Sequence, residues 1–189
     1  MSRTTGEPRP PRITWGQIFT WLGPWDRAAC LMCAALAFAL ALLRHGWGEA
    51  VVAALLGAVT AAITLIDRRH FRIPDLLSLP LIPLGLIAAH LAQAALMPRL
   101  LAMAVVWGVL TLLQWGFWAL RGRSGLGSGD VKLMAAAAVW VDPSVLPTYV
   151  LACAATALFE GLWRRARLQT KIAFGAHLAP WLALFVVFF

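Results

Sequence analysis

The chain has 189 residues, of which 61% are hydrophobic and only 13% are charged, and its formal net charge is +8. A soluble domain usually carries about 25% charged residues, so this composition excludes an ordinary soluble protein and predicts a membrane protein. The basic residues lie in short loops between apolar runs, a placement that argues against nucleic-acid binding.

The first 25 residues differ from the rest of the chain. Residues 1–12 are polar and rich in proline and arginine, which predicts a disordered basic tail and no cleavable signal peptide. In residues 13–25, tryptophan and aliphatic side chains recur at helical spacing. This stretch is either a short helix lying in the membrane interface or an irregular lead into the first span. We therefore divide the chain into residues 1–25 and a membrane-embedded domain of residues 26–189.

Seven apolar segments follow, and they predict an all-α polytopic membrane helical bundle with about six to seven transmembrane segments. The fifth segment has eleven residues and is short for a span, which needs about 20. In chain order the segments are Ala28–Leu43, Ala50–Ile66, Leu76–Met97, Leu100–Leu120, Val131–Val141, Ser144–Trp163 and Phe174–Phe189.

The basic residues predict the orientation of these segments. If the N-terminus is cytoplasmic and all seven segments cross, 14 of the 16 Lys and Arg residues lie on the cytoplasmic side. If the short fifth segment only dipped into the bilayer, the basic residues after the sixth would lie outside. We therefore expect it to cross, in a locally thin bilayer, as part of a multi-pass protein of the inner (cytoplasmic) membrane. Asp67, Asp75 and Asp130 then lie at the cytoplasmic boundary.

Two carboxylates are candidates for chemistry. Asp67 ends an apolar run and precedes two arginines, so it is either a helix-end carboxylate paired with an arginine or a functional membrane acid. Asp130 follows three alternate glycines and begins an apolar helix, so on its own it fits a helix N-cap. Their placement on one membrane face favours a shared site. A phosphate-binding glycine loop would need a preceding strand, and here a membrane helix precedes it.

Two carboxylates held close together can hydrolyse a peptide bond. They share one proton because two adjacent carboxylates do not both ionise readily. The ionised group acts as a general base on water, and the protonated group hydrogen-bonds the scissile carbonyl. This chemistry needs no metal and no other cofactor, and the sequence predicts neither. Gly127 and Gly129 would let an extended substrate backbone approach Asp130.

Three stretches resemble the signatures of type IV prepilin peptidases. LIDRRHFRIPDLLSLPL (residues 65–81) resembles their first signature, and GSGDVKLMAAAAVW (residues 127–140) resembles their G-x-G-D signature. AFGAHLAPWLAL (residues 173–184) is similar to their final phenylalanine-glycine segment. Presenilin-type proteases share the G-x-G-D motif, but the isoleucine-proline pair at positions 73 and 74 and the short chain favour the prepilin class.

This resemblance implies an aspartic endopeptidase that cuts the short basic leader of prepilin-like or pseudopilin-like proteins on the cytoplasmic face, as part of a type IV pilus or protein secretion system. The family's catalytic aspartates match Asp67 and Asp130. The other matched positions are two motif glycines and two supporting residues: Gly127, Gly129, Asp75 and Lys132.

The chain also departs from the family pattern. Large members carry a four-cysteine domain and methylate the new amino end, and this sequence has no such domain. It therefore resembles the short, peptidase-only form, for which we expect no methyltransferase activity. His177 stands where an apolar residue is common in the final segment. We expect it to be a packed or interfacial histidine rather than a third catalytic group.

Two other functions fit a membrane bundle with these acids. One is a non-catalytic assembly protein of the same fold, and the other is a small proton-coupled transporter. Transporters often show internal repeats and place acids near mid-membrane, whereas this sequence has no repeat and its acids lie at one edge. The expected partners are a membrane-anchored prepilin-like substrate and the lipid bilayer. The oligomeric state, and which aspartate is acid and which is base, are left open.

Overall fold

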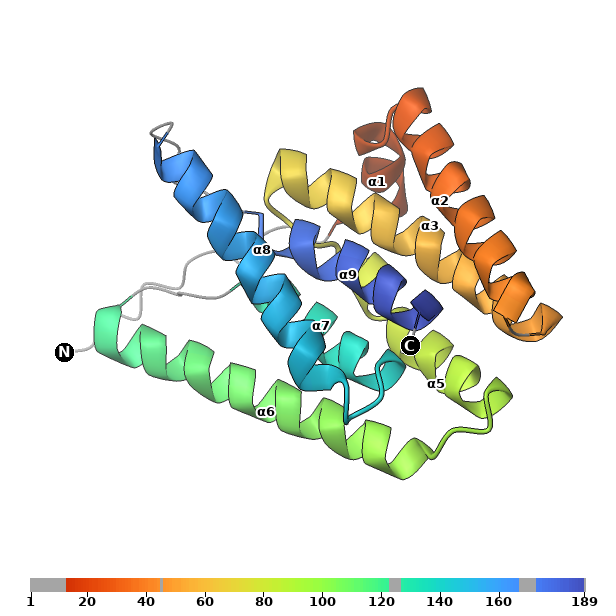
Figure 1. Ribbon diagram of the computed structural model, residues 1–189. Coiled ribbons are helices and arrows are strands. Elements are labelled where there is room, and N and C mark those ends of the chain that lie inside the picture. Colours follow the sequence, from red (N-terminus) through yellow and green to blue (C-terminus); the bar gives the residue numbers. More distant parts are fainter. Residues whose placement is uncertain (1–12, 45, 123–126, 167–172, 189) are drawn as a thin grey trace.

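The computed structural model describes residues 13–44, 46–122, 127–166 and 173–188, which are mostly helical (Figure 1). The predicted disordered tail of residues 1–12 lies outside the described residues. The helices are α1 Trp15–Trp21, α2 Pro24–Arg44, α3 Trp47–His70, α4 Asp75–Ser78, α5 Leu81–Leu91, α6 Leu96–Arg121, α7 Ser128–Trp140, α8 Leu146–Ala166 and α9 Gly175–Phe188. The predicted all-α fold is confirmed.

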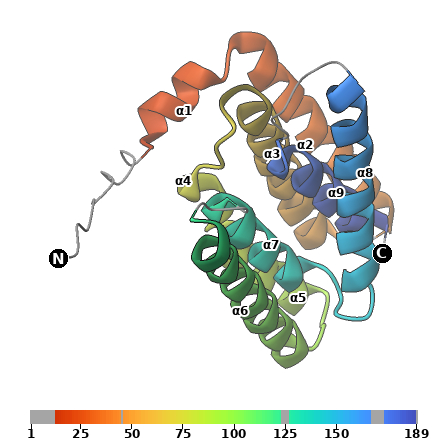
Figure 2. The ribbon, with the colours of Figure 1, turned by 90° about the vertical axis from the view of Figure 1, so that its left-hand side faces the viewer.

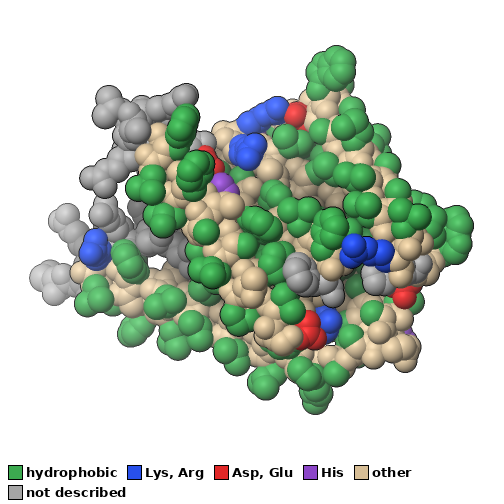
Figure 3. Space-filling view, in the orientation of Figure 1, with side chains coloured by type: hydrophobic (Ala, Val, Ile, Leu, Met, Phe, Trp, Pro, Cys, Tyr) green, Lys and Arg blue, Asp and Glu red, His purple; other side chains and the backbone are tan. Residues whose placement is uncertain are grey.

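Four of the described helices are long and apolar enough to cross a membrane: α2, α3, α6 and α8. The stretch Asp75–Leu91 and helix α9 are shorter apolar helices, and α7 has 13 residues. Apolar side chains cover much of the face shown in Figure 3, with few charges among them. A membrane helical bundle is therefore confirmed, whereas the crossing of the bilayer by α7 stays a prediction.

The third predicted segment is wrong in its detail. It was expected to run from Leu76 to Met97 with breaks at Pro80 and Pro83. The break at Pro80 is confirmed, but Pro83 lies in the first turn of α5, α5 ends at Leu91 and Met97 already belongs to α6. Proline lacks an N–H and does not fit a helix interior, and Pro80 lies at the break between α4 and α5. The turn after α5 contains Gln93 at φ 53°, a left-handed conformation that no helix continues.

Helix α7 lies at the centre of the bundle, and α5, α6 and α9 pack around it (Figures 1 and 2). Its side chains from Leu133 to Trp140 are all buried. A helix that is apolar on every side is stable only when neighbours surround it or when it faces lipid. Its run of four alanines, residues 135–138, has small side chains that let the neighbouring helices come close.

Helix α3 connects the two sides of the molecule, because it packs against α2 on one side and against α9 and α5 on the other. It ends at His70, and Phe71 then adopts a left-handed conformation with φ 51°. This turn lets residues 72–75 run back across the end of the bundle toward the start of α7. The carboxylates from α3 and α7 are therefore brought to the same end of the molecule.

The N-terminal stretch is helical over Trp15–Trp21, so the helical alternative for residues 13–25 is confirmed and the irregular one is wrong there. Ile18 and Leu22 are buried and belong to the main apolar core. The position of α1 at a membrane interface stays a prediction.

Candidate active site

A cleft of about 620 Å³ opens at the end of the bundle where α3 ends and α7 begins. Its walls come from the end of α3, the turn that follows it, α4 and the first residues of α7, together with Ile13 ahead of α1. All six residues that the sequence singled out line this cleft: Asp67, Asp75, Gly127, Gly129, Asp130 and Lys132. The structure thus brings together two stretches that lie about sixty residues apart.

Asp67 lies on the last turn of α3 and is only 4% exposed. Its Oδ2 accepts a hydrogen bond of 3.0 Å from the backbone N–H of Ala176, in the first turn of α9. The first N–H groups of a helix have no partner within the helix, and this helix end is electropositive. Asp67 therefore caps α9 from another helix. Burial disfavours its negative charge, and the contact with α9 favours it.

Asp130 is the third residue of α7 and precedes the apolar part of that helix. Burial raises the pKa of Asp130 to about 7, and the negative charge of Asp67 contributes to the increase. A backbone hydrogen bond from Gly127, the N-cap residue, opposes this shift. The prediction that Asp130 is itself the N-cap is therefore wrong, because Gly127 holds that position. The Asp130 carboxyl accepts a hydrogen bond from the N-cap residue and can hold a proton near neutral pH.

The two glycines of the motif have local packing reasons to be glycine. A Cβ at Gly129 would lie 2.9 Å from the Cβ of Ile73, and a Cβ at Gly127 would lie 2.8 Å from Asp130 Oδ2. Real Cβ atoms do not approach other atoms so closely. Gly127 is exposed at the cleft, so the idea that a substrate backbone passes beside it stays a prediction.

Asp75 and Lys132 form an ion pair across the cleft. Lys132 Nζ lies 2.7 Å from both carboxylate oxygens of Asp75. Asp75 begins α4 and Lys132 lies on the first turns of α7, so the pair ties the turn after α3 to the helix that carries Asp130. The sequence indicated both residues as supporting residues, but it did not predict that they contact each other.

Sequence reasoning gave no role to three residues that support Asp67: Ile73, Gly175 and Ala176. Ile73 lies between the starts of α7 and α9. Its side chain occupies the space that a Cβ on Gly129 or on Gly175 would need. A Cβ at Gly175 would overlap Ile73 Cδ1 and would lie 3.0 Å from Asp67 Oδ2. The signal was present in the isoleucine-proline pair and the phenylalanine-glycine segment, which were noted only as motifs.

His177 lies beside the site without entering the cleft. Its Nε2 is 2.5 Å from Glu160 Oε2 of α8, and its side chain is 11% exposed. This agrees with the expected packed histidine. Within the described ranges, no group of three or more His, Cys, Asp or Glu side chains could hold a metal ion, and the absence of a metal stays a prediction.

The fold and this cleft define a helical membrane protein with two acidic side chains at one end of the bundle. Residues 54–162 match the model of the type IV leader peptidase family. The chain belongs to this family, as its three motifs had indicated.

Several curated relatives are named "Prepilin leader peptidase/N-methyltransferase". The relative from Dickeya chrysanthemi is 35% identical over 167 residues, which are 85% of this chain and 57% of that protein. The relative from Xanthomonas campestris is 34% identical over 84% of this chain and 55% of its own length. The relative from Escherichia coli K12 is 36% identical over 84% of this chain and 71% of its own. The chain thus spans little more than half the length of the first two. No solved structure gives a significant match.

Proposed function

We propose that the chain is a membrane-embedded aspartic endopeptidase that removes the short basic leader of prepilin-like proteins. The observation that carries this proposal is the convergence of Asp67 and Asp130, from α3 and α7, in one cleft where the negative charge of Asp67 helps to raise the pKa of Asp130. Family membership and the names of the relatives support the substrate class. The transporter and assembly-protein alternatives account for the two acids less well, because neither needs them to share a proton.

The surroundings of the two acids support an assignment of their roles. Asp67 faces backbone N–H donors at the start of α9, which stabilise an anion, so it acts as the general base that takes a proton from water. The water oxygen then attacks the carbonyl carbon of the scissile bond. Asp130, with its raised pKa, keeps its proton and donates a hydrogen bond to the carbonyl oxygen. When the tetrahedral intermediate collapses, the C–N bond breaks, and the leaving amine takes from Asp67 the proton that Asp67 had removed from water.

The orientation in the membrane is part of this proposal. With the N-terminus in the cytoplasm, the cleft faces the cytoplasmic side of the inner membrane, where Arg68 and Arg69 end α3. A substrate that enters with a basic leader and an apolar helix would then present its cleavage site at the membrane boundary. Residues 26–189 form the peptidase domain.

The test is cleavage of several prepilins by membranes that contain the chain, followed as a size shift on a gel. We expect Asp67→Asn and Asp130→Asn each to reduce cleavage by a factor on the order of 1,000 or more, because each removes a group that transfers or holds the reacting proton. Asp142→Asn is the matched control. Asp142 follows α7 at its other end, where its Oδ1 accepts hydrogen bonds from Ser144, so cleavage should stay within about threefold of wild type.

The amount of inserted protein is measured for every variant. If the wild type cuts none of the prepilins, the proposed activity is wrong and the assembly-protein alternative is favoured. If both asparagine variants cut as well as the wild type, the assignment of the two aspartates is wrong.

A further inference from the structure

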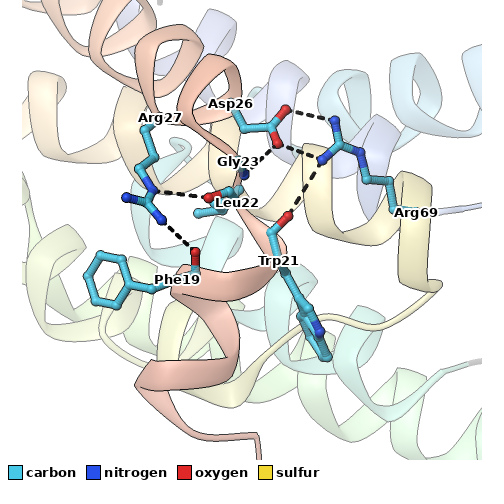
Figure 4. Close-up of polar contacts among 7 residues, drawn as sticks. All are labelled: Phe19, Trp21, Leu22, Gly23, Asp26, Arg27 and Arg69. Carbon is cyan, nitrogen blue, oxygen red and sulfur yellow. Dashed lines mark hydrogen bonds and ion pairs between the residues drawn. The ribbon is translucent and has the colours of Figure 1, made fainter.

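The N-terminal helix is attached to the same turn of α3 that carries Asp67. We call the residues that make this attachment the N-terminal clamp: Trp21, Asp26, Arg69 and His70 (Figure 4 shows all but His70). Arg69 and His70 follow Asp67 by two and three residues. On this last turn, Asp67 faces the cleft and α9. Arg69 and His70 face α1 and the start of α2 instead.

The polar half of the clamp is a bidentate ion pair between Arg69 and Asp26. Arg69 places its two terminal nitrogens 2.5 Å and 2.8 Å from the two carboxylate oxygens of Asp26. The Asp26 carboxylate also accepts the backbone N–H of Gly23 at 2.9 Å. Asp26 is 7% exposed as a residue, whereas the Arg69 side chain is 52% exposed. The bidentate geometry fixes the orientation of both side chains, which a single hydrogen bond would not do.

The aromatic half of the clamp is a stack. The rings of Trp21 and His70 are parallel to within 19°, with centroids 4.3 Å apart. Arg27 supports the turn between α1 and α2 from the other side, through hydrogen bonds to the carbonyl oxygens of Phe19 and Leu22 (Figure 4). Helix α1 has only seven residues, so it depends on such tertiary contacts for its position.

The position of α1 matters to the cleft because of Ile13. This residue immediately precedes the N-cap of α1, lines the cleft with Asp67 and Asp130, and packs against the main apolar core. It adds to the apolar surface of the cleft, to which Phe71, Ile73, Leu76 and Leu79 of the turn after α3 and of α4 also contribute, and it is the one described lining residue that comes from the N-terminal side of α1. If α1 swung away from α3, Ile13 would leave with it and the cleft would lose a wall.

We propose that Asp26 and Arg69 are positioning residues for substrate: they hold α1 so that Ile13 forms an apolar wall of the cleft, against which the substrate chain packs beside the cleavage site. This inference rests on the proposed peptidase function. It predicts an effect on substrate binding rather than on the chemical step, because Asp67 is held independently by α9.

The central variant is Asp26→Asn, which removes the charge and keeps the size of the side chain. It leaves Arg69 free to be solvated, since that side chain is half exposed. A substitution of Arg69 would instead leave the buried carboxylate of Asp26 without its partner and could prevent folding. For a prepilin that the wild type cuts, we expect Asp26→Asn to raise KM about tenfold and to leave kcat within about twofold. Asp26→Glu, which keeps the ion pair, should restore KM to within about threefold of wild type.

Ile13→Ser provides a test outside the clamp itself. It should raise KM to the same extent as Asp26→Asn, and the double variant should be no worse than either single one, because both act through the same wall. The matched control is Arg68→Gln, which removes a positive charge from the same turn of α3 at an exposed position. Its KM should stay within about twofold of wild type.

Each outcome decides between this inference and its alternatives. If the wild type cuts and Asp26→Asn leaves KM unchanged, the positioning role is wrong although the peptidase function stands. If Arg68→Gln raises KM equally, the effect is one of net charge and the clamp is not involved. If the KM effects of Asp26→Asn and Ile13→Ser multiply in the double variant, they act separately, and the link through Ile13 is wrong. If the wild type cuts no prepilin, the proposed function fails first.

Discussion

The two acids of the cleft are supported by different parts of the molecule. Asp67 is almost fully buried, and its support comes from another helix, through the N–H of Ala176 at the start of α9. Asp130 is partly exposed, and its backbone support comes from Gly127, three residues earlier in the chain. The first carboxylate is thus fixed by tertiary packing and the second by a local helix cap.

This difference underlies the opposite roles that we propose for the two side chains. A carboxylate that faces helix N–H donors is held in place as an anion. A carboxyl that is partly buried beside that anion resists ionisation, because a second negative charge nearby is unfavourable. In the proposed mechanism, Asp130 is therefore the better candidate for the protonated general acid and Asp67 for the general base.

Apart from replacing either aspartate, the largest expected effect comes from disturbing the support of Asp67. Gly175→Val would place side-chain atoms against Ile73 and within contact distance of Asp67 Oδ2, so the start of α9 and the carboxylate would have to separate. We expect kcat for prepilin cleavage to fall by a factor on the order of 100, because displacement of a catalytic group by about 1 Å has an effect of that size. The measurement is the cleavage rate at saturating substrate.

Gly116→Val in α6 is the control for this experiment, because a Cβ there meets nothing within 4 Å. Its rate should stay within about twofold of wild type. Ile73→Val removes the Cδ1 atom that a Gly175 side chain would overlap, so adding it to Gly175→Val should restore part of the activity. Full activity of Gly175→Val alone would show that α9 does not hold Asp67 in a catalytic position.

The second effect concerns Asp130 and pH. Its pKa is raised to about 7 and the proposed mechanism uses its protonated form. The protonated fraction falls as pH rises through that value, so kcat/KM should decrease above about pH 7, approaching about tenfold for each further pH unit. The check is a pH profile from 5.5 to 9 on protein in vesicles. A rate that increases through pH 7 would mean that the ionised form of Asp130 is the active one, and the roles assigned to the two acids would be reversed.

Much of the architecture could be predicted from the sequence. Long apolar runs determine helices in a membrane, so the segments that became α2, α3, α6, α7, α8 and α9 were expected at nearly their observed positions. The pairing of Asp67 with Asp130 was expected from their position at one boundary. The support of Asp67 by α9 was not, because a backbone N–H is present in every residue and its direction depends on how the helices pack.

Burial of the helices could not be predicted either. Helices α6 and α7 are both apolar, yet α7 is surrounded by other helices whereas none of the residues of α6 is buried. Composition alone does not distinguish a helix that faces lipid from one that faces protein, since both environments accept the same side chains. The alanines of α7 gave a partial signal, because small residues allow close helix packing.

The smallest expected effect tests whether Asp130 also has support from outside its own helix. Lys132 lies two residues after Asp130, and its ion pair with Asp75 joins α7 to α4. The two side chains are 36% and 55% exposed, and a solvated pair contributes only about 0–1 kcal/mol. We therefore expect Lys132→Gln and Asp75→Asn each to lower kcat/KM by about two- to fivefold, and the double variant to be no worse than either one. If Lys132 contacts substrate instead, Asp75→Asn would free Lys132 and lower KM, so a lower KM in this variant would contradict a structural role for the pair.

Equal, non-additive losses of kcat/KM in the two single variants would mean that Asp130 has a tertiary support of the same kind as Asp67, although a weaker one.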